Sequence, residues 1–243
     1  MAKENGLNVR LYVEGYDISG DANSLASIGY SNTLFEIATL DVSGMKRFLG
    51  PADGSVEVNG YFDNASGRIH PVFTSNSGKL PTADQGVMIP LGSAVGDPAV
   101  GMVTKEANYD TDRGGTSAIT VKSAFSVNGY PPEFSTMLTA HTDTVTASTS
   151  GTAVDDSASS SSGGSWFYQI LAISASGGNA RWTVKLQHST NNITYTDVSS
   201  ANVTAIGAAR AEFTGTLNRY IRNRLVLDAT SGSITFAICY NRA

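Results

Sequence analysis

Apolar and polar residues alternate along many short runs of this chain. In the first half the apolar positions of these runs are Val9, Leu11 and Val13; Val56, Val58 and Phe62; and Ile119, Val121, Phe125 and Val127. Because successive side chains of a strand point to opposite faces, a period of two predicts β-strands with one buried face. Clusters of Gly, Asn, Asp and Ser separate the runs, as expected for turns.

The second half predicts a denser succession of strands. The expected strands cover residues 166–175, the run of Trp182, Val184 and Leu186, residues 193–198 after the Asn191-Asn192 turn, the run of Ile221, Leu225 and Leu227, and a terminal run of Ile234, Phe236, Ile238 and Tyr240. Cys239 falls on the opposite face of that terminal run. Closely spaced strands without an intervening helix predict a β-sandwich.

Helix signals are confined to two short segments. Residues 43–49 could form one turn, capped by Ser43 and ended by the Gly-Pro pair that follows. Residues 66–75 could form another, which Pro71 would keep short. The chain is therefore expected to be almost entirely β.

Two segments interrupt the strand pattern. Residues 74–100 contain seven Gly and Pro residues and predict a long excursion with at most one short strand, over residues 87–91. Such an excursion is typical of an interaction arm or of a flexible surface loop. Residues 142–164 are mostly Ser, Thr, Ala, Gly and Asp, which fits either a flexible linker or, from the alternation at its start, an edge strand. A domain boundary is therefore expected near His141, with domains at 1–141 and 142–243.

Charge is distributed unequally between these two parts. The formal net charge is −5 over 243 residues. Residues 1–141 contain 9 Lys and Arg against 15 Asp and Glu, a net of −6, whereas residues 142–243 contain 7 against 6, a net of +1. The acidic first part repels phosphates, which argues against a DNA-binding surface there. An acidic wall would still let DNA slide past without being retained.

Composition excludes several classes of protein. Hydrophobic residues make up 41% and charged residues 15% of the chain, as in a soluble globular protein. No apolar run approaches the roughly 20 residues of a membrane-spanning helix, and the first residues lack the apolar stretch of a signal peptide. A single cysteine excludes an internal disulfide framework.

Residues with catalytic or metal-binding chemistry are few. The three histidines are His70, His141 and His188, and none has a metal-ligand spacing. Cys239 has no histidine near it in sequence, which favours a packed thiol. The segment from Asp110 to Gly115 lacks the distal ligands of a calcium loop, and no phosphate-binding glycine loop is present. We therefore expect no enzyme activity and no catalytic, cofactor or metal site.

Aromatic and basic residues of the second half raise a binding alternative. Trp166, Trp182, Tyr195 and Tyr220 could form a sugar-stacking platform on a small β-sandwich. However, Trp182 shares a face with the apolar residues of its run and fits the core. The cluster of Arg219, Arg222 and Arg224 fits a solvated or subunit-facing strand better than a nucleic-acid site, because no aromatic residues alternate with it in a loop.

The order of motifs in the first half resembles that of a known family. The sequence contains residues 9–13, Asp17-Ile18-Ser19-Gly20, residues 44–50 and residues 53–63 in that order. This arrangement looks like the opening of tail tube proteins of long-tailed bacteriophages, above all those with non-contractile tails. In that family an early strand carries an Asp-x-Ser turn, and a later strand has an Asp-Gly-x-x-x-x-x-Gly-x-Phe pattern that residues 53–62 match. A weaker similarity covers residues 129–164 and the Leu186-Gln187-His188-Ser189 and Asn218-Arg219-Tyr220-Ile221-Arg222 segments, whereas Pro131-Pro132 departs from the pattern.

The resemblance implies a fold and an assembly. Residues 1–141 would form a tail-tube-like β-sandwich or barrel with a short flanking helix and long loops, and residues 142–243 an outward-projecting β-sandwich. The subunits would form homo-hexameric rings that stack into a tube, through which DNA passes without specific binding. Other tail proteins would be further partners. The protein would belong to the virion tail, after assembly in the host cytoplasm, with no membrane partner. The alternatives are a virion surface or adhesin protein whose sandwich contacts glycans, and a head decoration protein.

Overall fold

The computed structural model describes residues 9–37, 44–75, 77–114 and 118–243. The first half contains β1 (Tyr12–Val13), β2 (Tyr16–Asp17), β3 (Ala22–Ile37), β4 (Lys46–Tyr61), α1 (Ile69–Phe73), β5 (Gln85–Pro90), β6 (Pro98–Asp112), β7 (Thr120–Val127) and β8 (Glu133–Met137). The second half contains β9 (Asp143–Val145), β10 (Thr149–Ser150), β11 (Val154–Asp155), β12 (Gly164–Ser176), β13 (Arg181–Ser189), β14 (Thr196–Val203), β15 (Gly207–Phe213), β16 (Tyr220–Asp228) and β17 (Ser231–Arg242). The all-β prediction is confirmed.

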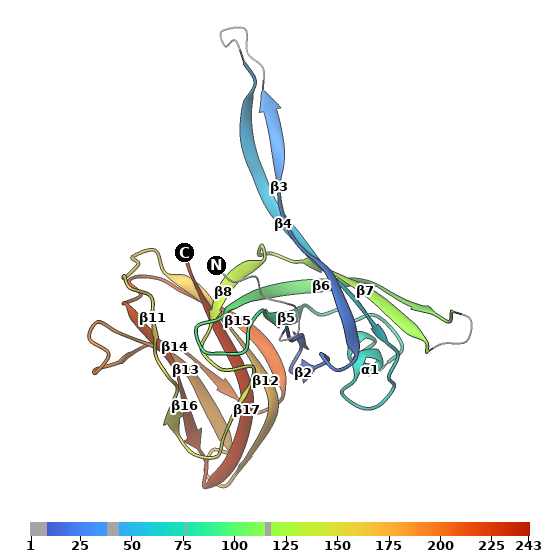
Figure 1. Ribbon diagram of the computed structural model, residues 1–243. Helices are drawn as coiled ribbons and strands as arrows, with labels where there is room; N and C mark the ends of the chain where they lie inside the picture. The colour runs from blue at the N-terminus through green and yellow to red at the C-terminus, as the bar shows by residue number, and fades with distance from the viewer. Residues whose placement is uncertain (1–8, 38–43, 76, 115–117) are drawn as a thin grey trace.

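The strands form two sheets in which neighbours run antiparallel. The larger, 12-stranded sheet has the order β15-β12-β17-β8-β6-β5-β1-β2, with β7 pairing β6, β4 pairing β7, β3 pairing β4, and β9 pairing β17. The smaller sheet has the order β10-β16-β13-β14, and β11 also pairs with β16. Figure 1 shows two β bodies side by side, with the β3–β4 ribbon rising from the first body. Among the described residues, no helix is long and apolar enough to span a membrane.

Each half has its own apolar core. In the second half, Trp166 and Phe236 of the larger sheet pack with Trp182 and Leu225 of the smaller sheet, so this half is the sandwich that the sequence predicts. In the first half, the core includes the inward residues of β1, β4, β5, β6 and β7 together with α1. The ring of Phe73 on α1 meets another core ring, Phe125 on β7, edge to face at 5.1 Å, which anchors the helix on the sheet.

A third core cluster joins the two halves. It contains Tyr12, Met88 and Met137 from the first half, and Phe167 and Cys239 from the second. β8 pairs with β6 on one side and with β17 on the other, so the larger sheet continues from one half into the other. The sheet and the shared cluster therefore make the two halves a single packed body.

Polar contacts reinforce this junction between the two halves, which we call the seam. The Gln169 side chain accepts a hydrogen bond from the Gly15 amide at 2.7 Å and donates one to the Gly86 carbonyl at 2.8 Å. Arg210 on β15 forms an ion pair with Glu133 on β8 at 2.5 Å, and their side chains are only 8% and 11% exposed. The boundary at residues 141 and 142 stays a proposal, because the two parts on either side of it share a sheet, a core cluster and a buried ion pair.

The helix predicted over residues 43–49 is wrong in the part that the structure describes. Residues 46–49 begin β4, and the expected cap Ser43 lies outside the described residues. The sequence signal for a helix end, Gly50-Pro51, instead coincides with a register shift in the β3–β4 ladder. Proline has no N–H to donate, and a bulge is one of the few places where a strand tolerates it.

Other expected elements agree more closely with the structure. Helix α1 lies within residues 66–75, and residues 74–100 contain β5 before β6 begins. Residues 142–164 are not a free linker, because β9 pairs with the larger sheet while β10 and β11 pair with the smaller one. The strand expected over residues 193–198 begins later, at the start of β14, and β15 was not expected.

Candidate assembly surface

The β3–β4 ribbon forms an arm that projects from the first body (Figure 1). Among the described residues, β3 pairs with β4 alone, and β4 pairs with β7 between Ser55 and Tyr61. From Lys46 to Gly54 the arm is therefore a two-stranded ribbon whose two edges pair with no other described strand. A single hairpin is only marginally stable in water, and unpaired strand edges are templates for pairing with another chain.

The distal part of the arm exposes large apolar side chains on both faces. Leu34 is 55% and Leu49 73% exposed, and the two stand opposite each other on one face. Phe35 and Phe48 stand opposite each other on the other face, 54% and 53% exposed. Tyr30, Ile37 and Met45 add further exposed apolar area.

This concentration of apolar surface suits a protein contact. Burying a large apolar side chain fully contributes roughly 1.5–3 kcal/mol, so the half-exposed residues would contribute about 1 kcal/mol each. Contiguous exposed apolar patches on soluble proteins mark interaction sites. Among the described residues of the distal arm, one ion pair joins Glu36 and Arg47 at 2.8 Å, and surface pairs of this kind contribute little.

Two glycines let the base of the arm pack closely on the body. A Cβ atom at Gly54 would overlap the ring of Pro132, and one at Gly60 would lie 2.7 Å from the Asp21 carbonyl oxygen. These are the two glycines of the Asp-Gly-x-x-x-x-x-Gly-x-Phe pattern, which therefore has a packing reason. Pro132, the departure from the family pattern, is the residue that covers the first of them.

The Asp-x-Ser turn also has a structural role. Asp17 Oδ1 accepts hydrogen bonds from the Ser19 amide at 3.0 Å and from the Ser19 hydroxyl at 2.5 Å. The Ser19 hydroxyl in turn accepts a hydrogen bond from the Leu11 amide at 2.8 Å. The turn thus ties the chain before β1 to the loop that leads into β3.

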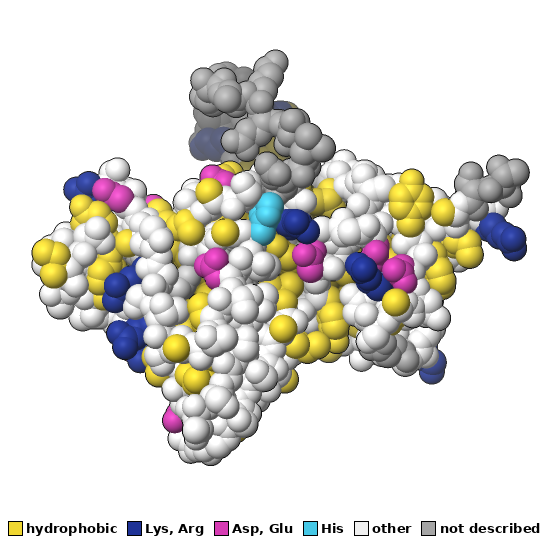
Figure 2. Space-filling model, turned by 60° about the horizontal axis from the view of Figure 1, so that its bottom comes forward, with side chains coloured by type: hydrophobic (Ala, Val, Ile, Leu, Met, Phe, Trp, Pro, Cys, Tyr) yellow, Lys and Arg dark blue, Asp and Glu magenta, His cyan; other side chains and the backbone are white. Residues whose placement is uncertain are grey.

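Lys and Arg side chains are spread over the face that Figure 2 shows, at its left, its centre and its right. The smaller sheet, which lies on the left in Figure 1, carries one group of them. The cluster of Arg219, Arg222 and Arg224 lies on this sheet, on or beside β16. Arg219 and Arg224 are exposed and Arg222 is half-buried. The expectation of a solvated or subunit-facing strand stays a prediction.

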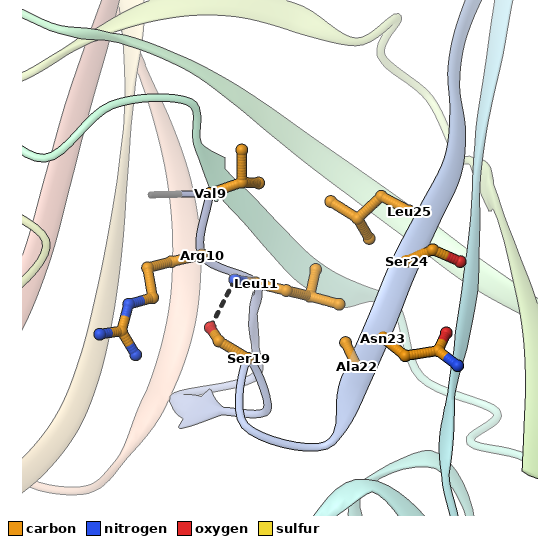
Figure 3. Close-up of a pocket in the computed structure, with 8 residues that line it drawn as sticks. All are labelled: Val9, Arg10, Leu11, Ser19, Ala22, Asn23, Ser24 and Leu25. Carbon is orange, nitrogen blue, oxygen red and sulfur yellow. Dashed lines mark hydrogen bonds between the residues drawn. The ribbon is translucent and has the colours of Figure 1, made fainter. Parts of the chain in front are cut away.

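A shallow cavity of about 320 Å³ lies where the arm leaves the body (Figure 3). Its lining consists of Val9, Arg10, Leu11, Ser19, Ala22, Asn23, Ser24 and Leu25. Arg10 points away from β3 in this view and forms an ion pair with Asp17 at 3.4 Å. The Ser19 hydroxyl of this lining is taken up by the turn, between Asp17 and the Leu11 amide. The other named lining residues are mostly apolar, so the cavity fits packing against apolar atoms.

The histidines and the cysteine are held in structural contacts. His70 Nδ1 lies 3.0 Å from the Tyr109 hydroxyl. His188 Nδ1 accepts a hydrogen bond from the Asn218 amide at 3.1 Å, and burial lowers the His188 pKa. Cys239 is a free, buried thiol whose pKa is raised to about 12 by burial. In the described ranges, no three His, Cys, Asp or Glu side chains are grouped so that they could hold a metal ion.

Glu106 is a buried acid in the core of the first half. Its Oε1 accepts a hydrogen bond from the Ser123 hydroxyl at 2.6 Å, while its Oε2 and the buried Gln85 Oε1 on the adjacent strand accept none. Burial raises the pKa of Glu106 to about 8. The carboxyl is therefore protonated at neutral pH in the folded protein, which removes the cost of burying a charge.

The proposed sugar-stacking platform is not assembled. Trp166 and Trp182 are fully buried, and their indole N–H groups donate to the Ser199 hydroxyl and the Ser174 carbonyl, each at 3.0 Å. Neither ring can stack on a sugar. In the suggested calcium loop, Asp110 and Asp112 lie in β6, and Gly115 lies outside the described residues.

Comparisons with known proteins give no family. No protein-family model matches the chain, and no curated protein matches it. Among solved structures, it is similar to a chain from the virion of a native gene transfer agent particle (14% identity, TM-score 0.40, covering 54% of this chain and 98% of that one). It is also similar to SPP1 Dit, described as a hub of the adsorption apparatus in phages infecting Gram-positive bacteria (10% identity, TM-score 0.36, covering 94% and 98%), and to a chain of the phage p2 baseplate (8% identity, TM-score 0.38, covering 94% and 97%). Scores below 0.5 do not establish a shared fold, so no property of these proteins is transferred to this chain.

Proposed function

We propose that this chain is a structural protein of a bacteriophage tail that assembles with further copies of itself through the β3–β4 arm. The observation that carries the proposal is the distal arm, with apolar side chains on both faces and two unpaired edges. A second copy is a fitting occupant, because pairing of identical subunits covers exposed edges in a repeating, closed arrangement. The resemblance of residues 9–63 to tail tube proteins gives the class of assembly.

The finer form of the proposal is a tail tube subunit. In that form the subunits make stacked, hexameric rings around a lumen that conducts DNA, with other tail proteins at the ends. The net charge of −6 over residues 1–141 supports a lumen that does not retain DNA. The sequence prediction that the protein is not an enzyme remains part of this proposal.

Electron microscopy of the purified full-length chain tests the assembly. We expect rings or tubes with an open centre from the natural chain. The variant Leu34→Ser/Leu49→Ser, which changes two exposed residues of one arm face, should remain monomeric in sedimentation. Its fold should be retained, because both side chains lie outside the core clusters.

A matched control separates the arm from general surface hydrophobicity. Ile193 and Ile206 are 82% and 42% exposed and lie in turns of the second half. Ile193→Ser/Ile206→Ser should assemble like the natural chain. The proposal is overturned if the natural chain stays monomeric at high concentration, or if the arm variant assembles as well as the control.

A further inference from the structure

The outer face of the smaller sheet concentrates the basic residues of the second half. Five of the seven Lys and Arg residues at positions 142–243 lie on β13 and β16 or directly before β16: Arg181, Lys185, Arg219, Arg222 and Arg224. Along β13 and β16 these side chains alternate with buried residues such as Trp182 and Leu225. The strand residues among them therefore point away from the sandwich core.

Three of these five cations are neutralised by neighbours. Arg219 donates two hydrogen bonds to Asp155, at 2.5 and 2.7 Å, Arg181 lies 3.0 Å from Asp228, and Lys185 lies 2.5 Å from Asp197. Arg222 and Arg224 have no ion pair with any described residue. These two arginines stand two positions apart on one face of β16.

The guanidinium of Arg222 is held in place. Its Nε donates a hydrogen bond to Gln187 Oε1 at 3.0 Å, and its guanidinium carbon lies 3.7 Å from the centre of the Tyr195 ring. Stacking and the hydrogen bond fix the orientation of the side chain, while its two terminal nitrogens form no hydrogen bond with a described residue. An oriented guanidinium fork is suited to binding a carboxylate, sulfate or phosphate group.

Arg224 stands directly opposite another basic residue, Lys185, in the β13–β16 ladder. Asp197 forms an ion pair with Lys185 and also attracts Arg224 electrostatically. Arg224 itself has no ion pair at 4 Å or less with a described residue, so its guanidinium donors are available to an external anion.

We propose that the outer face of the smaller sheet binds an acidic polysaccharide, with Arg222 and Arg224 contacting its anionic groups. Thr183 and Asn202 of the neighbouring β13–β14 ladder, which are joined to each other by a hydrogen bond at 2.8 Å, supply polar groups for sugar hydroxyls. Duplex DNA is a poorer fit, because its binding depends on many phosphate contacts and this face has two free cations. This site is distinct from the arm and does not depend on its role in assembly.

Affinity electrophoresis of the full-length chain tests the proposal. Gels would contain polygalacturonate, dextran sulfate or neutral dextran as probes, and duplex DNA would be measured in solution. The natural chain should be retarded by the two acidic polymers and not by neutral dextran. In Arg222→Gln/Arg224→Gln the affinity for the acidic polymers, measured from the retardation, should fall about tenfold, because two charge-assisted contacts are lost. The assembly-deficient arm variant Leu34→Ser/Leu49→Ser should bind like the natural chain, which separates this test from that of assembly.

The matched control is Lys79→Gln/Arg113→Gln. Both residues are exposed, lie in the first half and form no ion pair with a described residue, so this variant changes the net charge equally. Its affinity should stay within about twofold of the natural chain. The proposal is overturned by an equal loss in both double variants, by retardation in neutral dextran, or by DNA binding tighter than either acidic polymer.

Discussion

The buried ion pair between Glu133 and Arg210 gives the sharpest test of the seam. Glu133 receives hydrogen bonds from Arg210 Nη2 at 2.5 Å and from the Ser165 hydroxyl at 2.5 Å. Arg210 also stacks on the Tyr130 ring at 3.7 Å and contacts Glu212 at 2.7 Å. The change Glu133→Gln keeps the size of the side chain and leaves the arginine charge buried without its main partner.

The expected loss of stability follows from this burial. Removing one partner of a buried pair costs about 3–5 kcal/mol, and we expect the lower end because Glu212 still contacts the arginine. For a chain of 243 residues that unfolds as one unit, the unfolding entropy is about 0.5 kcal/mol per kelvin. A loss of about 3 kcal/mol then lowers the melting temperature by about 6 °C.

Calorimetry of the natural chain and of three variants would measure this. Glu212→Gln is the control, because it removes the exposed partner of the same arginine, with Glu212 at 58% exposure, and should cost less than about 1 kcal/mol. The double change Glu133→Gln/Arg210→Met should recover part of the loss, because no buried charge remains. If Glu133→Gln destabilises no more than Glu212→Gln, the seam is open to water in solution and the reasoning fails.

Three further predictions concern single residues. Gly101→Ala places a Cβ atom 2.5 Å from the Phe167 ring across the seam. This should lower the free energy of unfolding, measured in urea, by about 1–3 kcal/mol. Adding Phe167→Leu to this variant should recover part of the lost stability. Glu106 keeps its proton up to about pH 8 in the folded state, against a reference pKa of 4.5. The free energy of unfolding should therefore fall as the pH rises from 4.5 to 8, and in Glu106→Gln the denaturation midpoint should depend less on pH over that window. The same pH dependence in Glu106→Gln and the natural chain would contradict the buried acid. Cys239 should react with a disulfide reagent at pH 8 only after unfolding, because its thiol is buried and its pKa is about 12; rapid reaction of the native chain would refute this.

Sequence periodicity predicted the fold class and most strands because burial of one face is a local property of each run. The runs around Val56 and Trp182 were predicted for this reason, and both lie in cores. β15 was missed because its residues are only partly buried along most of their length, so it has no clear alternation of apolar and polar residues. The seam was not predicted, since its contacts join residues far apart in sequence.

The arm shows why the main candidate surface was misread in sequence. Gly50 and Pro51 are reliable signals for the end of a helix, but they serve equally well at a bulge. The signal that could have found the arm is the pair of segments at residues 34–37 and 45–49, each of which combines large apolar residues with charged ones, on either side of a short stretch. An apolar run with no inward face cannot be recognised as exposed from the sequence alone, because the same residues would fit a core strand.

The segment that follows β7 links the arm to the seam. Pro132 packs on Gly54 at the base of the arm, Glu133 is the buried partner of Arg210, and the Phe134 ring lies 6.5 Å from the Tyr30 ring on β3. Because three consecutive residues make these contacts, the base of the arm cannot shift without displacing β8, which pairs with both halves of the larger sheet. A second copy of the chain that binds the arm would therefore also fix the orientation of the second half. This would set where the smaller sheet and its basic face point in any assembly built through the arm.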